Sequence, residues 1–394
     1  MKVLCEYPLT WIQKEKKIDG IFLKNLFFAL VKNEFEVKLL PTAYTGNGVP
    51  IALNQDELLI SFHNYNNKCN TLTYKESPIK GLFSIDQSGY SGWADINKNL
   101  DNYIDEIKKI SITEAEKVIE KYKAKLFLGE SKYEQFKQNI ALPKDYIFFP
   151  LQVRTDSVAD LANIDMVAVL KKAAEISEQK QIPLVVKLHP FCNSEVVKAT
   201  VFMLQNEYEK FYVVNDDVVK LINNSKAVLC CNSGVGFEAL ILGKQVFCFG
   251  ESEWYAITKK ISSLEDIYSV FNSEISVITN YQKQFICYLL DQYWVDANDS
   301  VAIEKKIAIL IEKYTYAQTL KDAVDINYVN YVEAQKKLEK NKENIKLIER
   351  DFKYMNDLLN SFRRKPWLVF SYFFKYRINR FKLDWYKVSK KSKK

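Results

Sequence analysis

Three segments in the second half of the chain place reactive side chains directly after apolar runs. The first is FPLQVRTDS at residues 149–157, in which Asp156 follows a run that is typical of a buried strand. A carboxylate at this point can act as a nucleophile. It can equally cap the helix expected from Val158, and so can Ser157. This segment alone leaves both roles open.

The second segment is VVKLHP at residues 185–190. Lys187 and His189 are two residues apart on an expected strand, so their side chains project from the same face. Pro190 then ends the strand. A cation beside an imidazole suits an anionic group such as a phosphate. The alternative is that His189 is a buried strand-end residue that bonds only to backbone groups.

The third segment is CCNSGVGFEAL at residues 230–240. Small residues after a strand let the amides at the start of the next helix approach an anion. Glu238, in the first turns of that helix, can accept hydrogen bonds from a ribose diol. The helix dipole alone also favours a glutamate there. Because ligands of open α/β sheets bind beyond the carboxyl ends of the strands, the three segments together predict one ligand site.

The elements that must position these segments alternate between strand and helix. The expected strands are continuous apolar runs, as in a parallel sheet covered on both faces. They lie at residues 146–153, 183–188, 211–214, 227–231 and 245–249. The helices expected between them lie at residues 158–179, 194–207, 216–223 and 235–242. This pattern predicts a Rossmann-like domain.

The N-terminal part shows a weaker alternation, which is typical of an open α/β sheet. Its expected strands lie at residues 2–5, 36–40, 57–62 and 80–85. A helical stretch is expected at residues 22–31, and a charged helix at 113–123 with Ser111 or Thr113 as its N-cap.

The motifs FFPLQVRTDS, VVKLHP and SGVGFEALILGKQV together resemble the capsular-polysaccharide synthesis family. That family includes retaining β-Kdo transferases that use CMP-activated sugars. The resemblance covers roughly residues 145–255, and GLFSIDQSGYSGW at residues 81–93 is a looser match. It implies an α/β GT-B fold, in which two Rossmann-like domains face a cleft. The expected regions are an acceptor domain at 1–142, a CMP-sugar donor domain at 143–315, a heptad-patterned helical region at 316–362 and a basic aromatic tail at 363–394.

The resemblance also implies roles for single residues. Asp156 is the expected carboxylate nucleophile of a retaining reaction, and His189 with Lys187 is expected to meet the CMP phosphate. Ser233 and Glu238 are expected to hold the phosphate and the ribose. The other expected substrate contacts are Gln152, Arg154, Pro190, Asn232, Gly234, Gly236, Phe237 and, on the first domain, Asp86, Tyr90 and Trp93.

The chemistry of these residue types agrees with such a role. A sugar that leaves its nucleotide develops oxocarbenium character, which a carboxylate stabilises or captures. The single phosphate of CMP can be neutralised by cations, an imidazole and helix amides without a metal. The chain has no Asp-x-Asp triplet, so no metal or cofactor is expected beyond the donor. The open alternatives are a transferase for another CMP-nonulosonic acid or a polyol phosphate, and a non-catalytic scaffold that tethers an assembly complex.

Composition predicts a cytosolic protein of two domains with an appendage. The 394 residues are 48% hydrophobic, and the apolar runs are far shorter than the ~18–20 residues of a membrane span. The seven cysteines form no C-x-x-C pair, and the N-terminus lacks the apolar core of a secretory signal.

Charge divides the chain unevenly. The net charge is +7, yet residues 363–394 carry twelve Lys or Arg against Asp384, which leaves −4 for residues 1–362. Aromatic residues alternate with these cations, a composition that suits an anionic membrane surface. The resemblance to the capsular-polysaccharide family implies a lipid-linked or oligosaccharide acceptor, which agrees with that location. No recognised nucleic-acid fold precedes the tail, so nucleic acid is not an expected partner. The heptad seam at 331–362 predicts either a helix packed on its own chain or a homodimer.

Overall fold

The computed structural model describes residues 2–12, 17–33, 35–42, 53–54, 57–65, 70–132, 141–274 and 277–321. Both sheets of this part of the chain lie in one compact unit, residues 1–192 and 209–322. Helix α7 (Glu195–Glu207) lies in a second unit, where the Ser194 side chain accepts a hydrogen bond from the backbone N–H of Val197. The segments expected as heptad helix at 331–362 and as basic tail at 363–394 lie outside the described residues.

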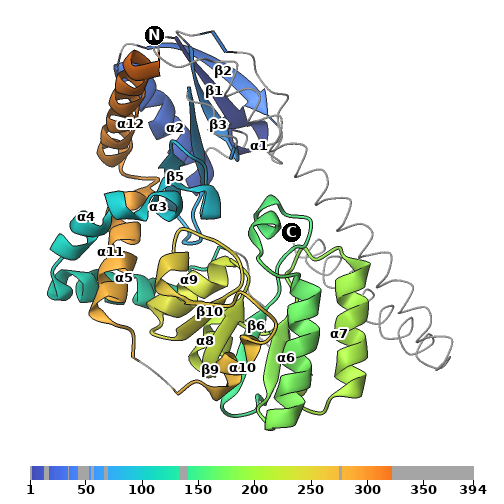
Figure 1. Ribbon diagram of the computed structural model, residues 1–394. Helices are drawn as coiled ribbons and strands as arrows, with labels where there is room; N and C mark the ends of the chain where they lie inside the picture. Colours follow the sequence, from blue (N-terminus) through green and yellow to red (C-terminus); the bar gives the residue numbers. More distant parts are fainter. Residues whose placement is uncertain are drawn as a thin grey trace, which may run out of the picture. The chain divides into compact units, whose positions relative to one another are not determined.

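The first sheet has six strands in the order β12-β5-β4-β3-β1-β2 (Figure 1). Strands β1 to β4 are parallel, whereas β5 and β12 join in antiparallel fashion. The strands are β1 (Lys2–Pro8), β2 (Glu36–Thr42), β3 (Glu57–Phe62), β4 (Thr71–Glu76), β5 (Leu82–Asp86) and β12 (Val295–Asp296). The helices against this sheet are α1 (Leu9–Ile12), α2 (Ile18–Lys32) and α12 (Ser300–Lys321).

The second sheet has six parallel strands in the order β11-β10-β9-β6-β7-β8. They are β6 (Tyr146–Pro150), β7 (Leu184–Lys187), β8 (Phe211–Val213), β9 (Ser225–Cys230), β10 (Gln245–Cys248) and β11 (Lys259–Lys260). Its helices include α6 (Met166–Lys180), α8 (Val218–Asn223), α9 (Gly234–Ile241), α10 (Ile267–Asn272) and α11 (Asn280–Tyr288). Strands β6, β7 and β10 are buried along their whole length, as their continuous apolar runs predict.

The remaining elements complete the described part of the chain. The α-helices are α3 (Asp95–Lys98), α4 (Ile104–Lys109) and α5 (Ile112–Phe127). The 3-10 helices are η1 (Ser91–Trp93), η2 (Leu100–Asn102), η3 (Ser157–Leu161) and η4 (Tyr255–Ile257), and η5 (Leu289–Tyr293) is a π-helix. Ser111 caps α5 as predicted, because its hydroxyl accepts from the backbone N–H of Glu114 at 3.2 Å.

The expected helix at residues 158–179 is two elements. It divides into η3 and α6 because Asp165 starts a new helix, accepting from the backbone N–H groups of Val167 and Ala168 at 3.1 Å each. Strand β4 was absent from the expected elements. Its sequence TLTYKE has only two strongly apolar residues and ends in charges, so it lacks the apolar run that marked the other strands.

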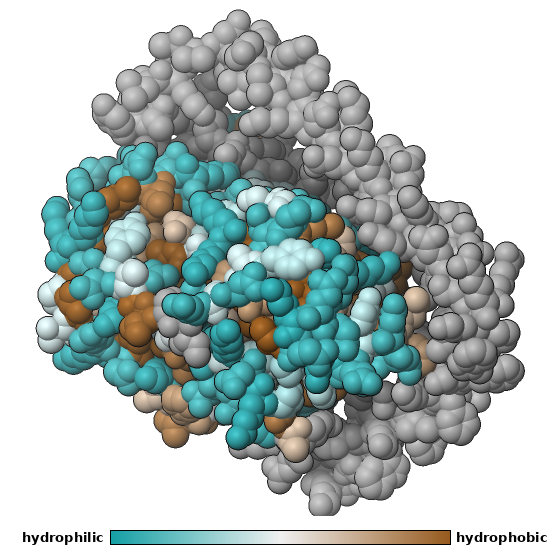
Figure 2. All heavy atoms as spheres, turned by 60° about the horizontal axis from the view of Figure 1, so that its bottom comes forward, coloured by the Kyte–Doolittle hydropathy of each residue, from teal (hydrophilic) through white to brown (hydrophobic). Residues whose placement is uncertain are grey.

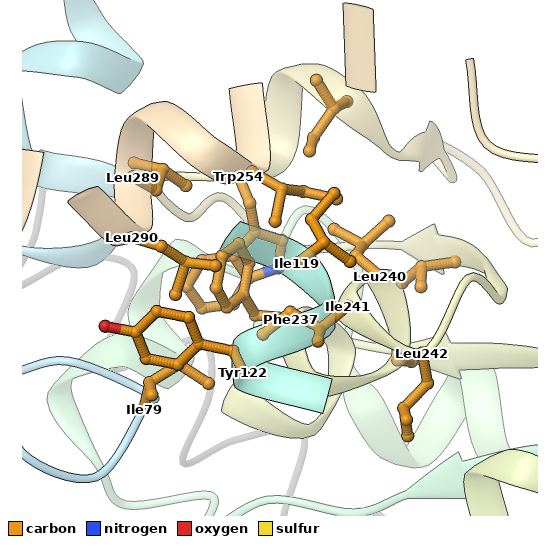
Figure 3. Packing of buried hydrophobic residues seen from close by; sticks show 14 of the residues in the cluster. Ile79, Ile119, Tyr122, Phe237, Leu240, Ile241, Leu242, Trp254, Leu289 and Leu290 are labelled. Atoms are coloured by element: carbon orange, nitrogen blue, oxygen red, sulfur yellow. The ribbon is translucent and has the colours of Figure 1, made fainter. Parts of the chain in front are cut away.

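Each of the two hydrophobic cores contains residues from both sides of the expected domain boundary at residue 142. Helix α5 presents Ala115, Ile119, Tyr122 and Leu126 on one face, and this face packs into the core of the second sheet. Figure 3 shows Ile119 and Tyr122 close to Phe237 of α9. Conversely, β12 and α12 return to the first sheet, where α12 lies beside α2 (Figure 1). Residues 295–311 therefore complete the first core rather than the second.

These sheets confirm the expected α/β GT-B architecture, two Rossmann-like halves that face a cleft. The surface is mixed in polarity: Figure 2 shows hydrophilic side chains interspersed with small hydrophobic groups over one face. Within the described ranges, no helix is both long and apolar enough to cross a membrane.

Candidate active site

The three segments singled out in the sequence meet at one cavity. Strands β9, β6 and β7 are neighbours in the second sheet, so the turns after them lie together at its carboxyl edge. The cavity there has a volume of about 200 Å³ and is also lined by residues of the first half. The expected site residues that line it are Tyr90, Gln152, Asp156, Lys187, His189, Pro190, Asn232, Ser233, Gly234 and Glu238.

Asp156 lies at the N-cap position of η3 and also lines the cavity. Its Oδ1 accepts from the backbone N–H of Val158 at 3.5 Å, which is a long hydrogen bond. The Ser157 hydroxyl donates to the same oxygen at 3.3 Å. The carboxylate is exposed and weakly held as a cap, so it is available to a ligand in the cavity.

Lys187 and His189 both line the cavity from the end of β7, as their spacing predicts. The Lys187 ammonium donates to the backbone carbonyl of Asp216 at 2.7 Å, and burial lowers the pKa of this lysine. Nδ1 of His189 accepts from the backbone N–H of Phe191 at 3.1 Å. Burial and the Lys187 charge lower the pKa of His189, so at neutral pH its imidazole is neutral and carries its proton on Nε2.

The N-terminus of α9 forms a further wall. Ser233 is its N-cap and accepts from the backbone N–H of Val235 at 3.4 Å. A Cβ atom at Gly234 would lie 3.0 Å from Cβ of Pro78, so glycine allows the close approach of the first half here. One turn further along, burial raises the pKa of Glu238 to about 8, helped by Asp217 and opposed by Lys187. The Glu238 carboxyl is therefore mostly protonated at pH 7.

Several polar atoms around the cavity have no hydrogen-bond partner among the described residues, although they are buried. These atoms are Ser84 Oγ, Ser131 Oγ, Gln152 Nε2, Asn232 Oδ1 and Trp254 Nε1. The Asn232 amide is fixed in place, because its Nδ2 donates to the carbonyls of Val158 at 2.8 Å and Glu251 at 3.0 Å. Buried polar groups normally find partners, so these atoms are positioned to bond to ordered water or to a polar ligand.

Two expected site residues are held in buried interactions away from the cavity lining. Nη2 of Arg154 lies 2.8 Å from Oδ2 of Asp165, with both side chains buried, so Arg154 supports the N-cap of α6. Asp86 is 3% exposed and accepts hydrogen bonds from the Tyr293 hydroxyl and from three backbone amides, those of Ser88, Gly89 and Asp95. Asp86 therefore organises its own loop.

Three further expected contacts are packing residues. A Cβ atom at Gly236 would lie 2.7 Å from Sγ of Cys230, so this glycine lets α9 pack on β9. Phe237 is fully buried, and Figure 3 shows its ring near Trp254 within the core. Trp93 stacks on Tyr65 with ring centroids 4.0 Å apart and does not belong to the cavity lining.

The first half supplies charged residues that sequence reasoning missed. Lys75 and Glu76 end strand β4, and both line the cavity, as does Lys132. Glu253, which follows β10 in the second half, lines the cavity as well. Burial raises the pKa of Glu253, whose carboxylate accepts from the backbone N–H of Ser91 at 3.0 Å. Lys75 and Glu76 lie at the carboxyl end of a parallel strand, where ligand-binding residues are expected. They could have been predicted from the sequence only if β4 had been recognised as a strand.

His63 lies beside this group, with its Nε2 3.2 Å from Oε2 of Glu76. Burial and the charge of Lys75 lower the pKa of His63 to about 4, so it is neutral at physiological pH. Burial alone would raise the pKa of Glu76, but Lys132 and the His63 hydrogen bond hold it well below its usual range. Among the residues that the structure describes, no cluster of three or more His, Cys, Asp or Glu side chains could hold a metal ion.

Part of the chain is similar to proteins of known families. Residues 86–259 match the family model described as capsule polysaccharide biosynthesis protein. Protein FixF of Sinorhizobium fredii is 30% identical over 122 residues, which make up 29% of this chain and 28% of that protein. The chain thus spans less than a third of the length of that relative.

Two solved structures are among those similar to this chain. KpsC β-Kdo 2,7 transferase of Thermosulfurimonas dismutans is 15% identical, with 78% of this chain and 100% of that chain covered and a TM-score of 0.47. Methanocaldococcus jannaschii UDP-GlcNAc 2-epimerase is 12% identical, with 79% and 100% covered and a TM-score of 0.35. Residues 86–259, which carry the three cavity segments, are thus similar to the capsule polysaccharide biosynthesis family.

Proposed function

We propose that the chain is a retaining glycosyltransferase that moves Kdo from CMP-Kdo to a saccharide acceptor during capsule polysaccharide synthesis. The observation that carries the proposal is that Asp156 lines the same cavity as a set of groups suited to a phosphate. That set consists of Lys187, His189 and the amides at the start of α9. The family of residues 86–259 supports the link to capsule polysaccharide.

The geometry suits a double displacement. In the first step an Asp156 oxygen forms a bond to the anomeric carbon, and the bond from that carbon to the phosphate oxygen breaks. The electron pair stays on the phosphate, where the Lys187 ammonium and the His189 Nε2–H stabilise the charge. An acceptor hydroxyl then attacks the anomeric carbon from the other side and gives its proton to the phosphate of CMP, while the bond from that carbon to Asp156 breaks. Two inversions give net retention.

The nucleotide has suitable partners in the same walls. Glu238 can exchange hydrogen bonds with a ribose diol, because its mostly protonated carboxyl has both a donor and acceptors. Gln152 Nε2 and Asn232 Oδ1 offer a donor and an acceptor that no described residue occupies. Because Lys187, His189 and the amides at the start of α9 can neutralise the phosphate, the proposed reaction needs no metal or cofactor.

The proposal extends to location. A cytoplasmic enzyme at the inner face of the bacterial inner membrane would meet a lipid-linked acceptor there, and the basic tail at 363–394 would attach to anionic lipid. A homodimer through residues 331–362 also stays a prediction, because both segments lie outside the described residues.

A binding comparison tests the nucleotide assignment. CMP should raise the melting temperature of the full chain more than UDP does, because a ligand that binds only the native state stabilises it by mass action. The same shift should persist in EDTA. A stronger response to UDP, or a response that requires magnesium, would overturn the assignment of CMP.

A further inference from the structure

Lys75 is distinguished from the other cavity lysines by its lack of a polar partner. Lys132 donates to the carbonyl of Ser77 at 3.3 Å, and Lys187 donates to that of Asp216 at 2.7 Å. The Lys75 ammonium has no hydrogen-bond acceptor or ion-pair partner among the described residues. Its contact is with the face of the Tyr90 ring, whose centroid lies 4.1 Å from Nζ.

This arrangement leaves a cation in the cavity wall that an anion would stabilise. Burial lowers the pKa of Lys75, which shows that the charged form is only partly compensated by its surroundings. A ring face attracts a cation but does not replace a hydrogen-bond acceptor. A bound ligand that brings an anionic oxygen to Nζ would supply the missing partner.

Lys75 and Asp156 border the same part of the cavity. The Tyr90 hydroxyl, on the ring that Lys75 contacts, lies 2.8 Å from Oγ of Ser157. The Ser157 hydroxyl in turn donates to Oδ1 of Asp156 at 3.3 Å. Asp156 is also the carboxylate that most favours the charged form of Lys75. A group held by Lys75 therefore lies near the atom that Asp156 attacks in the proposed reaction.

We propose that Lys75 binds the carboxylate of the donor sugar and thereby selects a 2-ulosonic acid over a neutral sugar. The inference rests on the proposed function. A 2-ulosonic acid carries its carboxylate on the anomeric carbon itself, so an attacking Asp156 faces a like charge. A cation between the two carboxylates reduces this repulsion and fixes the orientation of the sugar.

The test compares donor and nucleotide binding in Lys75→Met and in Lys80→Met, a control lysine that is exposed and does not line the cavity. Isothermal titration of the full chain should show CMP-Kdo binding weakened about tenfold or more in Lys75→Met, with CMP binding unchanged. Lys80→Met should bind both as the wild type does. Lys75→Arg should restore part of the CMP-Kdo affinity, because it restores the cation.

Other outcomes separate the inference from the proposed function. Unchanged CMP-Kdo affinity in Lys75→Met would overturn the inference, and an equal loss of CMP affinity would assign Lys75 to the phosphate instead. A loss confined to the KM of the acceptor would place the bound carboxylate on the acceptor and would also overturn it. A wild-type chain that binds neither CMP nor CMP-Kdo would contradict the proposed function itself.

Discussion

The Tyr90 hydroxyl lies 2.8 Å from Oγ of Ser157 and joins the two halves of the cavity. Ser157 uses its single proton to donate to Asp156, so the tyrosine is the donor in this contact. Tyr90 comes from the first half of the chain, whereas Ser157 begins η3 after the second half's first strand. The proposed nucleophile is thus oriented by a residue that also supports Lys75.

Stability should depend on the protonation of Glu238. The pKa of this carboxyl is about 8 in the folded chain, above its ordinary value of 4.5, chiefly because of burial. Between these two values the native state holds a proton that the unfolded state has lost, so the contribution of Glu238 to stability falls as pH rises from 4.5 to 8. Glu238→Gln removes this proton linkage. The melting temperature of the variant, relative to wild type, should therefore increase between pH 5 and pH 8, and a constant difference would contradict the burial argument.

Arg154 should matter for stability and not for nucleotide binding. Arg154→Met leaves Asp165 as a buried carboxylate without this guanidinium, a change that costs about 3–5 kcal/mol when a buried pair is broken. Urea unfolding should show this loss. The folded variant should bind CMP with wild-type affinity, since Arg154 does not line the cavity. A large loss of CMP affinity with normal stability would contradict this and indicate that Arg154 contacts the nucleotide.

The candidate site could be predicted in part, because its second-half segments follow continuous apolar strands. Those runs located β6, β7 and β9, and the rule for parallel sheets then brought Asp156, His189 and Ser233 together. The first-half wall could not be predicted in the same way. Lys75 lies near the end of β4, a strand that alternates Thr with apolar residues and lacks the continuous apolar run of the others. Its pairing with β3 and β5 exists only in the folded sheet.

Long-range contacts explain the other misses. Asp86 has the residue type and glycine-rich surroundings of a ligand loop. Its carboxylate, however, accepts a hydrogen bond from the hydroxyl of Tyr293, 207 residues later in the chain. That contact exists because the chain crosses back to the first sheet through β12. Phe237 likewise lies in the SGVGFEAL motif, but its ring packs against Trp254 and Trp294 and does not face the cavity. Spacing alone does not separate such residues from ligand contacts.

The basic tail should carry membrane attachment and leave the chemistry intact. Deletion of residues 364–394 should preserve turnover on a short soluble acceptor, because the cavity is built from residues 75–254. Sedimentation with anionic liposomes should be lost on deletion, and in the full chain it should weaken as salt rises. Undiminished liposome binding by the shortened chain would place the membrane contact elsewhere.

Asp156→Asn is the most direct test of the central claim that this carboxylate is the nucleophile. Asparagine caps a helix about as well as aspartate, so fold and CMP affinity should be retained. Transfer from CMP-Kdo should fall by roughly a thousandfold or more, because the amide is a poor nucleophile. Asp160→Asn, an exposed position in the same 3-10 helix, is the matched control and should transfer normally. Transfer by Asp156→Asn at a rate close to that of the control would contradict the double displacement.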